Sequence, residues 1–213
     1  VDRVMTTAHE LGMTAAAITD HGTLYGLVDS YKKAKSKGIK PILGCEAYVA
    51  AGNMRDRKTA DGKSYSNHLV LLAETNEGYR NLCRLSSLAH LEGFYYKPRI
   101  DKELLRKHSK GLIGLSSCLK GEITSLCAGN NIDAAVRAAN EYSEIFGKNN
   151  FFLAIQDHGI PEQRIANRGI LEVAKRTGLP IGATNDVHYL KAEHAEAHEV
   201  LLCLQTQTVM SDP

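Results

Sequence analysis

Gly38-Ile39-Lys40-Pro41-Ile42-Leu43-Gly44-Cys45-Glu46-Ala47-Tyr48-Val49 is the stretch of sequence that indicates the fold class. Its part from Pro41 to Val49 is rich in apolar and β-branched residues and is predicted to form a strand. Gly38 stands where the C-terminal cap of a preceding helix is expected, and Pro41 opens the strand at a point where no ladder donor is lost. The stretch therefore marks a passage from helix to strand.

The same succession of a helix and a strand is predicted at several places along the chain. Apolar residues at helical spacing precede the stretch, at Leu24, Leu27, Val28, Tyr31 and Ala34. Five further strands are predicted from short apolar or β-branched segments: Ala15 to Thr19, Leu69 to Ala73, Leu112 to Leu115, Phe151 to Ile155, and Pro180 to Ala183. Alternation of strand and helix predicts parallel strands joined by helical crossovers, so we expect an α/β sheet or barrel. The polar stretch from Ala51 to Asn67 is predicted to be an exposed loop.

Composition limits the function classes. The 213 residues carry a formal net charge of +2, 43% hydrophobic residues and 23% charged residues, which fits one compact domain or at most two small ones and excludes a disordered chain. That net charge does not by itself hold a polyanion, so nucleic acid would have to be bound by local groups. The five cysteines form no C-x-x-C pair, which argues against a disulfide framework and a zinc ribbon. No apolar run approaches the roughly 18 to 20 residues of a membrane span, and no signal-peptide layout is present, so a cytoplasmic location is expected.

Potential metal ligands follow five of the six predicted strands. The exits read Thr19-Asp20-His21-Gly22, Gly44-Cys45-Glu46-Ala47, Ser116-Ser117-Cys118, Gln156-Asp157-His158-Gly159 and Thr184-Asn185-Asp186-Val187-His188. Because the carboxyl ends of parallel strands meet at one edge, these side chains are expected to converge on a metal site.

Strand alternation narrows the choice at two of these exits. It places Asp186 and His188 on one side, and it lets only one of Cys45 and Glu46 face the site. We favour Glu46, because a carboxylate is costly in the layer that faces the helices, where a thiol packs easily. On pattern alone His68 begins its strand, at the end opposite the site, and is expected to be structural.

The segment Phe94-Tyr95-Tyr96-Lys97-Pro98-Arg99 couples aromatic rings to two cations, a composition suited to stacking bases and contacting phosphates, although a packed solvated loop is an equal alternative. His158 is a weaker candidate for a ligand or loop-orienting residue. The chain has no P-loop, no G-x-G-x-x-G after a strand and no G-x-S-x-G elbow, which disfavours mononucleotide kinases, dinucleotide dehydrogenases and serine hydrolases.

Several motifs in order resemble those of one family. They are Ile18-Thr19-Asp20-His21-Gly22, the stretch from Gly38 to Tyr48, Asn67-His68-Leu69-Val70-Leu71-Leu72-Ala73, Gly78-Tyr79-Arg80-Asn81-Leu82 and Ala183-Thr184-Asn185-Asp186-Val187-His188-Tyr189. Together they resemble the PHP (polymerase and histidinol phosphatase) domain of bacterial DNA polymerase III alpha subunits.

The resemblance implies a distorted seven-stranded β/α barrel, similar to a TIM barrel, with a cluster of two or three divalent metals, zinc or manganese. The ligand positions that it implies are His21, Glu46, His68, Cys118, Asp186 and His188. The family opens with a strand carrying an H-x-H motif and a following acidic ligand, which this sequence lacks. We therefore expect residues 1–213 to be a single PHP domain without its first strand, cut before the polymerase domains.

The resemblance also implies a function. The parent chain would perform template-directed DNA synthesis, and the domain would be a metal-dependent phosphoesterase, a 3′–5′ proofreading exonuclease. Lys97, Arg99 and His158 would contact a DNA 3′ end. Further partners would be the polymerase domains of the same chain, a proofreading subunit and the rest of the replicase.

Two alternatives remain open. One is a non-catalytic scaffold that stabilises the polymerase and docks a separate proofreading subunit, and the other is a free-standing phosphatase, for example one acting on histidinol phosphate. The chain as given is expected to bind metal weakly and to be inactive by itself.

Overall fold

The computed structural model describes residues 1–57, 66–147 and 149–212. Its strands are β1 (Ala15–Ile18), β2 (Lys40–Ala50), β3 (Ser66–Ala73), β4 (Arg99–Ile100), β5 (Leu112–Leu115), β6 (Phe151–Ile155) and β7 (Ile181–Ala183). Its helices are α1 (Asp2–Glu10), α2 (Leu27–Ser36), α3 (Asn76–Leu91), α4 (Lys102–His108), α5 (Glu122–Ala128), α6 (Ile132–Phe146), α7 (Pro161–Thr177), the 3₁₀ turn η1 (Ala192–His194) and α8 (Ala195–Thr206). The α/β class and all six predicted strands are confirmed, and β4 is a two-residue strand that the sequence pattern did not show.

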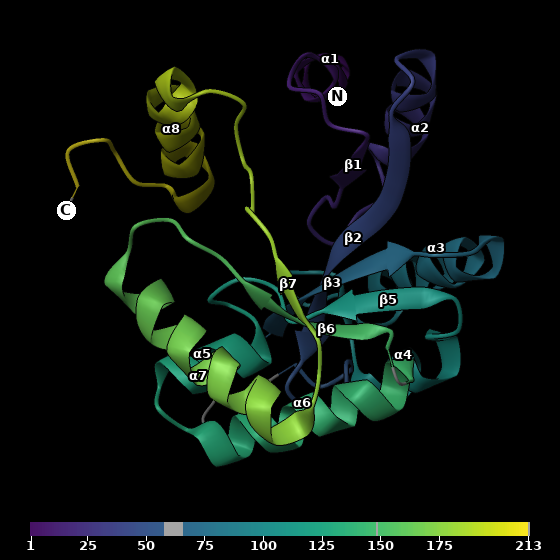
Figure 1. Ribbon diagram of the computed structural model, residues 1–213, viewed down its shortest axis with the longest axis vertical. Helices are drawn as coiled ribbons and strands as arrows, with labels where there is room; N and C mark the ends of the chain where they lie inside the picture. The colour runs from purple at the N-terminus through teal and green to yellow at the C-terminus, as the bar shows by residue number, and fades with distance from the viewer. Residues whose placement is uncertain (58–65, 148, 213) are drawn as a thin grey trace.

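The sheet has the order β1-β2-β3-β5-β6-β7, with β4 paired to β2, and it curls into a half-barrel (Figure 1). Within the described residues β1 and β7 are its two edges and do not pair with each other. Helices α6 and α7 lie along one side of the sheet, whereas α8 and the pair α1 and α2 stand on opposite sides of the open edge (Figure 1).

The expectation that all strands run parallel was wrong for β3. This strand pairs antiparallel with both β2 and β5, while the pairs β1 with β2, β5 with β6, and β6 with β7 are parallel. Reversal of one central strand places its first residues at the edge where its neighbours end. His68, near the start of β3, therefore lies opposite Tyr48, near the end of β2.

The core forms between the sheet and the amphipathic face of α6. The ring of Phe151 on β6 is fully buried and stacks on Tyr142 and Phe146, with centroids 5.2 and 5.9 Å away. Burial of one such side chain contributes about 1.5–3 kcal/mol. This packing fixes β6, which pairs with β5 and β7, the two strands followed by Cys118 and Asp186.

The predicted stripe on α2 is only half buried. Leu27 and Ala34 enter the interior, but Val28 and Tyr31 are exposed. Helix α2 packs mainly against β2, near the edge of the sheet, so only part of its circumference is covered. No described helix is both long and apolar enough to cross a lipid bilayer.

The predicted loop from Ala51 to Asn67 is shorter than expected, because β3 begins at Ser66. Met54 within it is buried, and its amide donates to Asp101 Oδ2 at 3.0 Å. Residues 58–65 of the predicted loop lie outside the described residues.

Candidate metal centre

Backbone pairing continues past the end of β1 and brings His21 beside Glu46. The amide of Glu46 donates to Asp20 O at 3.1 Å, and the amide of Gly22 donates to Glu46 O at 2.9 Å. As a result His21 Nδ1 lies 3.5 Å from Glu46 Oε2. Two potential ligands from different strands are thus held by main-chain hydrogen bonds.

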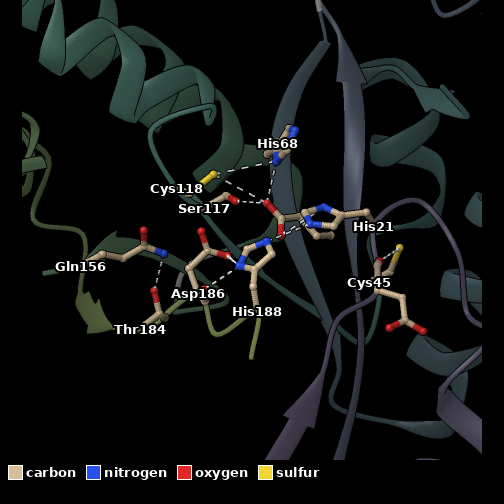
Figure 2. Close-up of polar contacts among 11 residues, drawn as sticks. His21, Cys45, His68, Ser117, Cys118, Gln156, Thr184, Asp186 and His188 are labelled. Carbon is tan, nitrogen blue, oxygen red and sulfur yellow. Dashed lines mark hydrogen bonds and ion pairs between the residues drawn. The ribbon is translucent and has the colours of Figure 1, made fainter. Parts of the chain in front are cut away.

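Alternation along β2 separates Cys45 from Glu46, as the sequence predicted. The Cys45 side chain is packed in the main apolar core, where burial raises the pKa of its thiol to about 12. Figure 2 shows Cys45 apart from the other labelled side chains. Glu46, only 4% exposed, faces the opposite side, and its carboxylate is the centre of the candidate site.

His68 reaches this carboxylate because β3 is antiparallel. Its Nδ1 donates to Glu46 Oε1 at 2.7 Å, and its ring lies edge-on to Tyr48 with centroids 5.1 Å apart. The structure therefore overturns the expectation that His68 lies at the end of its strand opposite the site. The ring of His21 is 5.6 Å away, so two imidazoles flank one carboxylate.

The turn after β5 adds two further groups. Ser117 has a φ of 65°, in the left-handed region, and its hydroxyl donates to Glu46 Oε1 at 2.8 Å. Cys118 Sγ lies 3.8 Å from both Glu46 Oε1 and His68 Nδ1. The strained backbone at Ser117 aims the hydroxyl at the carboxylate, an arrangement that is common at functional sites.

Asp186 and His188 complete the cluster from the other edge of the sheet. Both follow the end of β7, so strand alternation is not what aligns them. The φ of Asp186 is 47°, and His188 Nδ1 donates to Asp186 O at 2.8 Å. His188 Nε2 then lies 3.4 Å from His21 Nε2, and Asp186 Oδ1 is 3.9 Å from His188 Nδ1 (Figure 2). All six predicted ligand positions thus belong to one connected cluster.

The electrostatics of the cluster centre on Glu46 and His68. Burial opposes ionisation of Glu46, but hydrogen bonds from His68 and Ser117 and the nearby imidazoles outweigh it, so the pKa of Glu46 is lowered. Burial likewise opposes protonation of His68, yet its contacts with Cys118 and Glu46 raise the pKa of His68 to about 9. Partial burial, aided by His68 and His188, lowers the pKa of His21 against the attraction of Glu46. Glu46 and His68 therefore stabilise each other's charged form across their hydrogen bond.

The donor set fits a divalent metal. Ligand atoms of His21, Glu46 and His68 all lie within 4.8 Å of one another, and no other group of this kind occurs among the residues that the structure describes. Imidazole and carboxylate donors suit zinc, and carboxylates also accept manganese. A cavity of about 490 Å³ adjoins the cluster and is bordered by His21, Glu46, Asp186 and His188.

The three predicted substrate-binding residues have different surroundings. Lys97 Nζ lies 5.5 Å from the ring centroid of Tyr48, at the rim of the cluster. His158 Nε2 donates to Asn185 O at 2.9 Å and so holds the loop that carries Asp186. Arg99 does not face the site: it is 4% exposed and donates to Met54 O and Asp56 O, so the expectation that it contacts DNA is not supported.

Two residues of the cluster were not predicted. Tyr48 packs against the rings of both His21 and His68, and alternation from Glu46 to Tyr48 on one strand is the signal that shows it. Ser117 holds the Glu46 carboxylate, but a serine in a turn carries no sequence signal for this role.

A model of the PHP domain family matches residues 1–158. The chain belongs to the PHP domain family. Two DNA polymerase III alpha subunits are similar to this PHP domain: that of Thermus aquaticus is 52% identical over 93% of the chain, and that of Treponema pallidum is 44% identical over all of it. The chain covers 16% and 18% of these relatives, less than a fifth of their length.

Among solved structures, a Bifidobacterium adolescentis protein provisionally assigned as a metal-dependent phosphoesterase matches the PHP domain with a TM-score of 0.40 and 14% identity. The match covers 99% of this chain and 91% of that one.

Proposed function

We propose that residues 1–213 form a single PHP domain of a DNA polymerase III alpha subunit, in the cytoplasm, and that its metal centre hydrolyses phosphodiester bonds at a DNA 3′ end. Sequence identity of 39–52% to alpha subunits along nearly the whole chain supports the parent protein. The observation that carries the activity is the buried Glu46 carboxylate, which is flanked by His21 and His68 and fixed by Ser117.

His21, Glu46 and His68 would hold one divalent ion, zinc or manganese, and Cys118, Asp186 and His188 would supply ligands to the same ion or to a neighbouring one. Such ions, when bound, lower the pKa of water and neutralise charge on phosphoryl oxygens. The residues of the chain orient these groups. Ser117 fixes one carboxylate oxygen of Glu46, and the buried ring of Tyr48 packs against both imidazoles and so limits their orientation.

The other side chains control approach to the site. Lys97 at the rim attracts the anionic backbone, and His158 keeps the Asp186 loop against the centre. In a replicative polymerase this hydrolysis would be 3′–5′ proofreading, and the partners would be the DNA 3′ end, the polymerase domains of the same chain and the remaining replicase subunits.

The test uses the longest natural form of the protein that contains these residues. A 5′-labelled primer with a mismatched 3′ end is incubated with zinc or manganese, and shortening of the primer is followed for wild type and Asp186→Asn. We expect the substitution to reduce hydrolysis by about a hundredfold or more, because losing a ligand should cost at least as much as losing a group that only orients one, which costs about 10- to 100-fold. Asp133→Asn is the matched control, because Asp133 is an exposed carboxylate on α6 that pairs with Arg176 away from the site.

Hydrolysis unchanged in Asp186→Asn would contradict the proposal. Metal bound without any hydrolysis, together with retention of a separate proofreading subunit, would favour the scaffold function instead.

A further inference from the structure

The segment from Phe94 to Pro98, which we call the aromatic loop, joins α3 to β4 and presents two aromatic rings to solvent. Phe94 is 57% exposed and Tyr96 is 78% exposed. Tyr96 also has a φ of 57°, which turns the backbone sharply at this position. Two exposed rings next to a candidate active site offer flat apolar faces on which the bases of a strand can stack.

The loop is fixed from beneath by Arg99. Its guanidinium donates to Gly93 O at 3.2 Å and also to Met54 O and Asp56 O, and it lies 5.4 Å from the ring centroid of Tyr95. The Tyr95 ring in turn contacts Tyr96 edge-on, with centroids 4.6 Å apart. The exposed Tyr96 ring is thus backed by an ordered stack, which lowers the entropic cost of binding another ring.

The aromatic loop borders the candidate metal centre. Lys97 Nζ lies 5.5 Å from the centroid of Tyr48, whose ring touches both His21 and His68. Pro98 packs beside Tyr48 over Gly22, where an added Cβ would lie 2.8 Å from Pro98 Cγ. Lys97 and Pro98 of the aromatic loop thus lie against the Tyr48 side of the centre.

Two lysines, Lys97 and Lys120, lie near this rim. In the part of the chain that the structure describes, no carboxylate forms an ion pair with Lys97 or with Lys120, and both side chains are exposed. Lys120 stands beside the centre because its carbonyl accepts from the His68 amide at 2.9 Å. Two cations and two stacking surfaces match the alternating phosphates and bases of a single strand.

We propose that the aromatic loop binds single-stranded nucleic acid, with bases stacked on Tyr96 and Phe94 and a backbone phosphate beside Lys97. The inference rests on the proposed function, and it names the substrate class: a strand with unpaired bases rather than a small phosphate ester. Duplex bases are already stacked on one another, so a duplex gains little from the loop.

The experiment measures fluorescence anisotropy of a labelled oligothymidylate of about 12 nucleotides, within the range that single-strand sites cover, with the 213-residue chain. We expect Tyr96→Ala to weaken binding about tenfold, because stacking of one base on an aromatic ring contributes on that order. Lys97→Gln should flatten the dependence of log affinity on log salt by about 0.7, the amount for one phosphate of a single strand.

Tyr31→Ala and Lys35→Gln are matched controls, since both residues are exposed on α2 and lie outside the loop and the centre. The melting temperature of each variant excludes a folding defect. An oligouridylate of equal length shows whether the loop distinguishes RNA from DNA.

Equal affinity of wild type and Tyr96→Ala, or equal affinity for single strand and duplex, would overturn the proposal. The nuclease assay with Asp186→Asn separates it from the proposed function. Binding that depends on Tyr96 without hydrolysis supports the loop and contradicts the nuclease. Hydrolysis that depends on Asp186, with binding indifferent to Tyr96, contradicts the loop alone.

Discussion

Glu46 shows how one buried charge organises a site. A carboxylate that is 4% exposed is unfavourable unless its oxygens are paired, and here His68 and Ser117 both donate to Oε1 while His21 lies near Oε2. Strand alternation shows that only one of Cys45 and Glu46 can face the site, and the cost of burying a carboxylate in the layer that faces the helices is what selects Glu46. The partner Ser117 could not be predicted, since its role depends on a turn whose φ of 65° no local pattern specifies.

Loss of the Ser117 hydroxyl tests this arrangement. We expect Ser117→Ala to lower the affinity for zinc or manganese by about 10- to 100-fold, the usual effect of removing a group that orients a metal ligand. Isothermal titration with either metal measures the change. Ser125→Ala, which removes an exposed hydroxyl bonded to Glu122 O, is the control, and affinity equal to wild type in Ser117→Ala would show that the carboxylate needs no such support.

A second charged group lies away from the site, between α4 and α6. Burial opposes ionisation of Glu141, but Lys102 and Arg106 donate to its two oxygens and together lower its pKa. Its contribution to stability is therefore fully present above the ordinary glutamate pKa, about 4.3, and is lost as pH falls through the lower folded value.

Glu141→Gln should consequently destabilise the chain near neutral pH by a few tenths of a kcal/mol, a value discounted because the pair is partly exposed. The difference from wild type should shrink as the pH is lowered below about 4.3. Urea midpoints at several pH values measure it. Glu103→Gln, in the exposed pair with Lys107, should change the midpoint little at any pH, and a Glu141→Gln deficit that grows in acid would contradict this account.

At the scale of elements, the sequence predicted where strands lie but not how β3 runs. Apolar runs define a strand locally, whereas its direction depends on partners far along the chain. A signal was nevertheless present: no helical pattern separates β2 from β3, and parallel neighbours need a crossover that is usually a helix. The direction of β3 determines where His68 lies. An all-parallel sheet would place His68 at the edge opposite Glu46, whereas the antiparallel β3 places it opposite Tyr48 near the end of β2.

The start of α3 packs closely against the turn before β5, and a substitution at Gly78 tests how much this close packing matters for stability. An added Cβ there would lie 1.8 Å from the carbonyl oxygen of Gly111, so the helix start and the turn before β5 would have to separate. Replacing glycine by alanine in a helix stabilises it by only about 1 kcal/mol, whereas overpacking of this kind destabilises a protein by typically 1–3 kcal/mol or more. We expect Gly78→Ala to destabilise the chain by about 2 kcal/mol in urea unfolding.

Gly182→Ala is the matched control, because the nearest atom to its added Cβ is Phe152 Cβ at 4.0 Å. This variant should remain within about 0.5 kcal/mol of wild type. Equal stability of the two variants would mean that the turn before β5 relaxes freely.

For the whole molecule, the candidate metal centre spans the open side of the half-barrel. His21 follows the first strand of the sheet and His188 follows the last, and among the described residues β1 and β7 share no ladder. The contact between the imidazoles of His21 and His188 therefore connects two sheet edges that share no backbone hydrogen bonds in the described residues.

A metal ion bound by both His21 and His188 should link the two edges of the sheet and stabilise the folded molecule. At a free zinc or manganese concentration about 100 times the dissociation constant, we expect about 2.7 kcal/mol of stabilisation, which raises the melting temperature by roughly 5 to 10 °C for a chain of this size.

Hydrogen exchange should slow after both β1 and β7 when the metal is bound, because an ion shared by His21 and His188 restrains the ends of these two strands together. His188→Ala should keep the protection near His21 and Glu46 and lose it at residues 184–188. Protection confined to β1, β2 and β3 in wild type would instead place the metal on His21, Glu46 and His68 alone, and the two edges would then move independently.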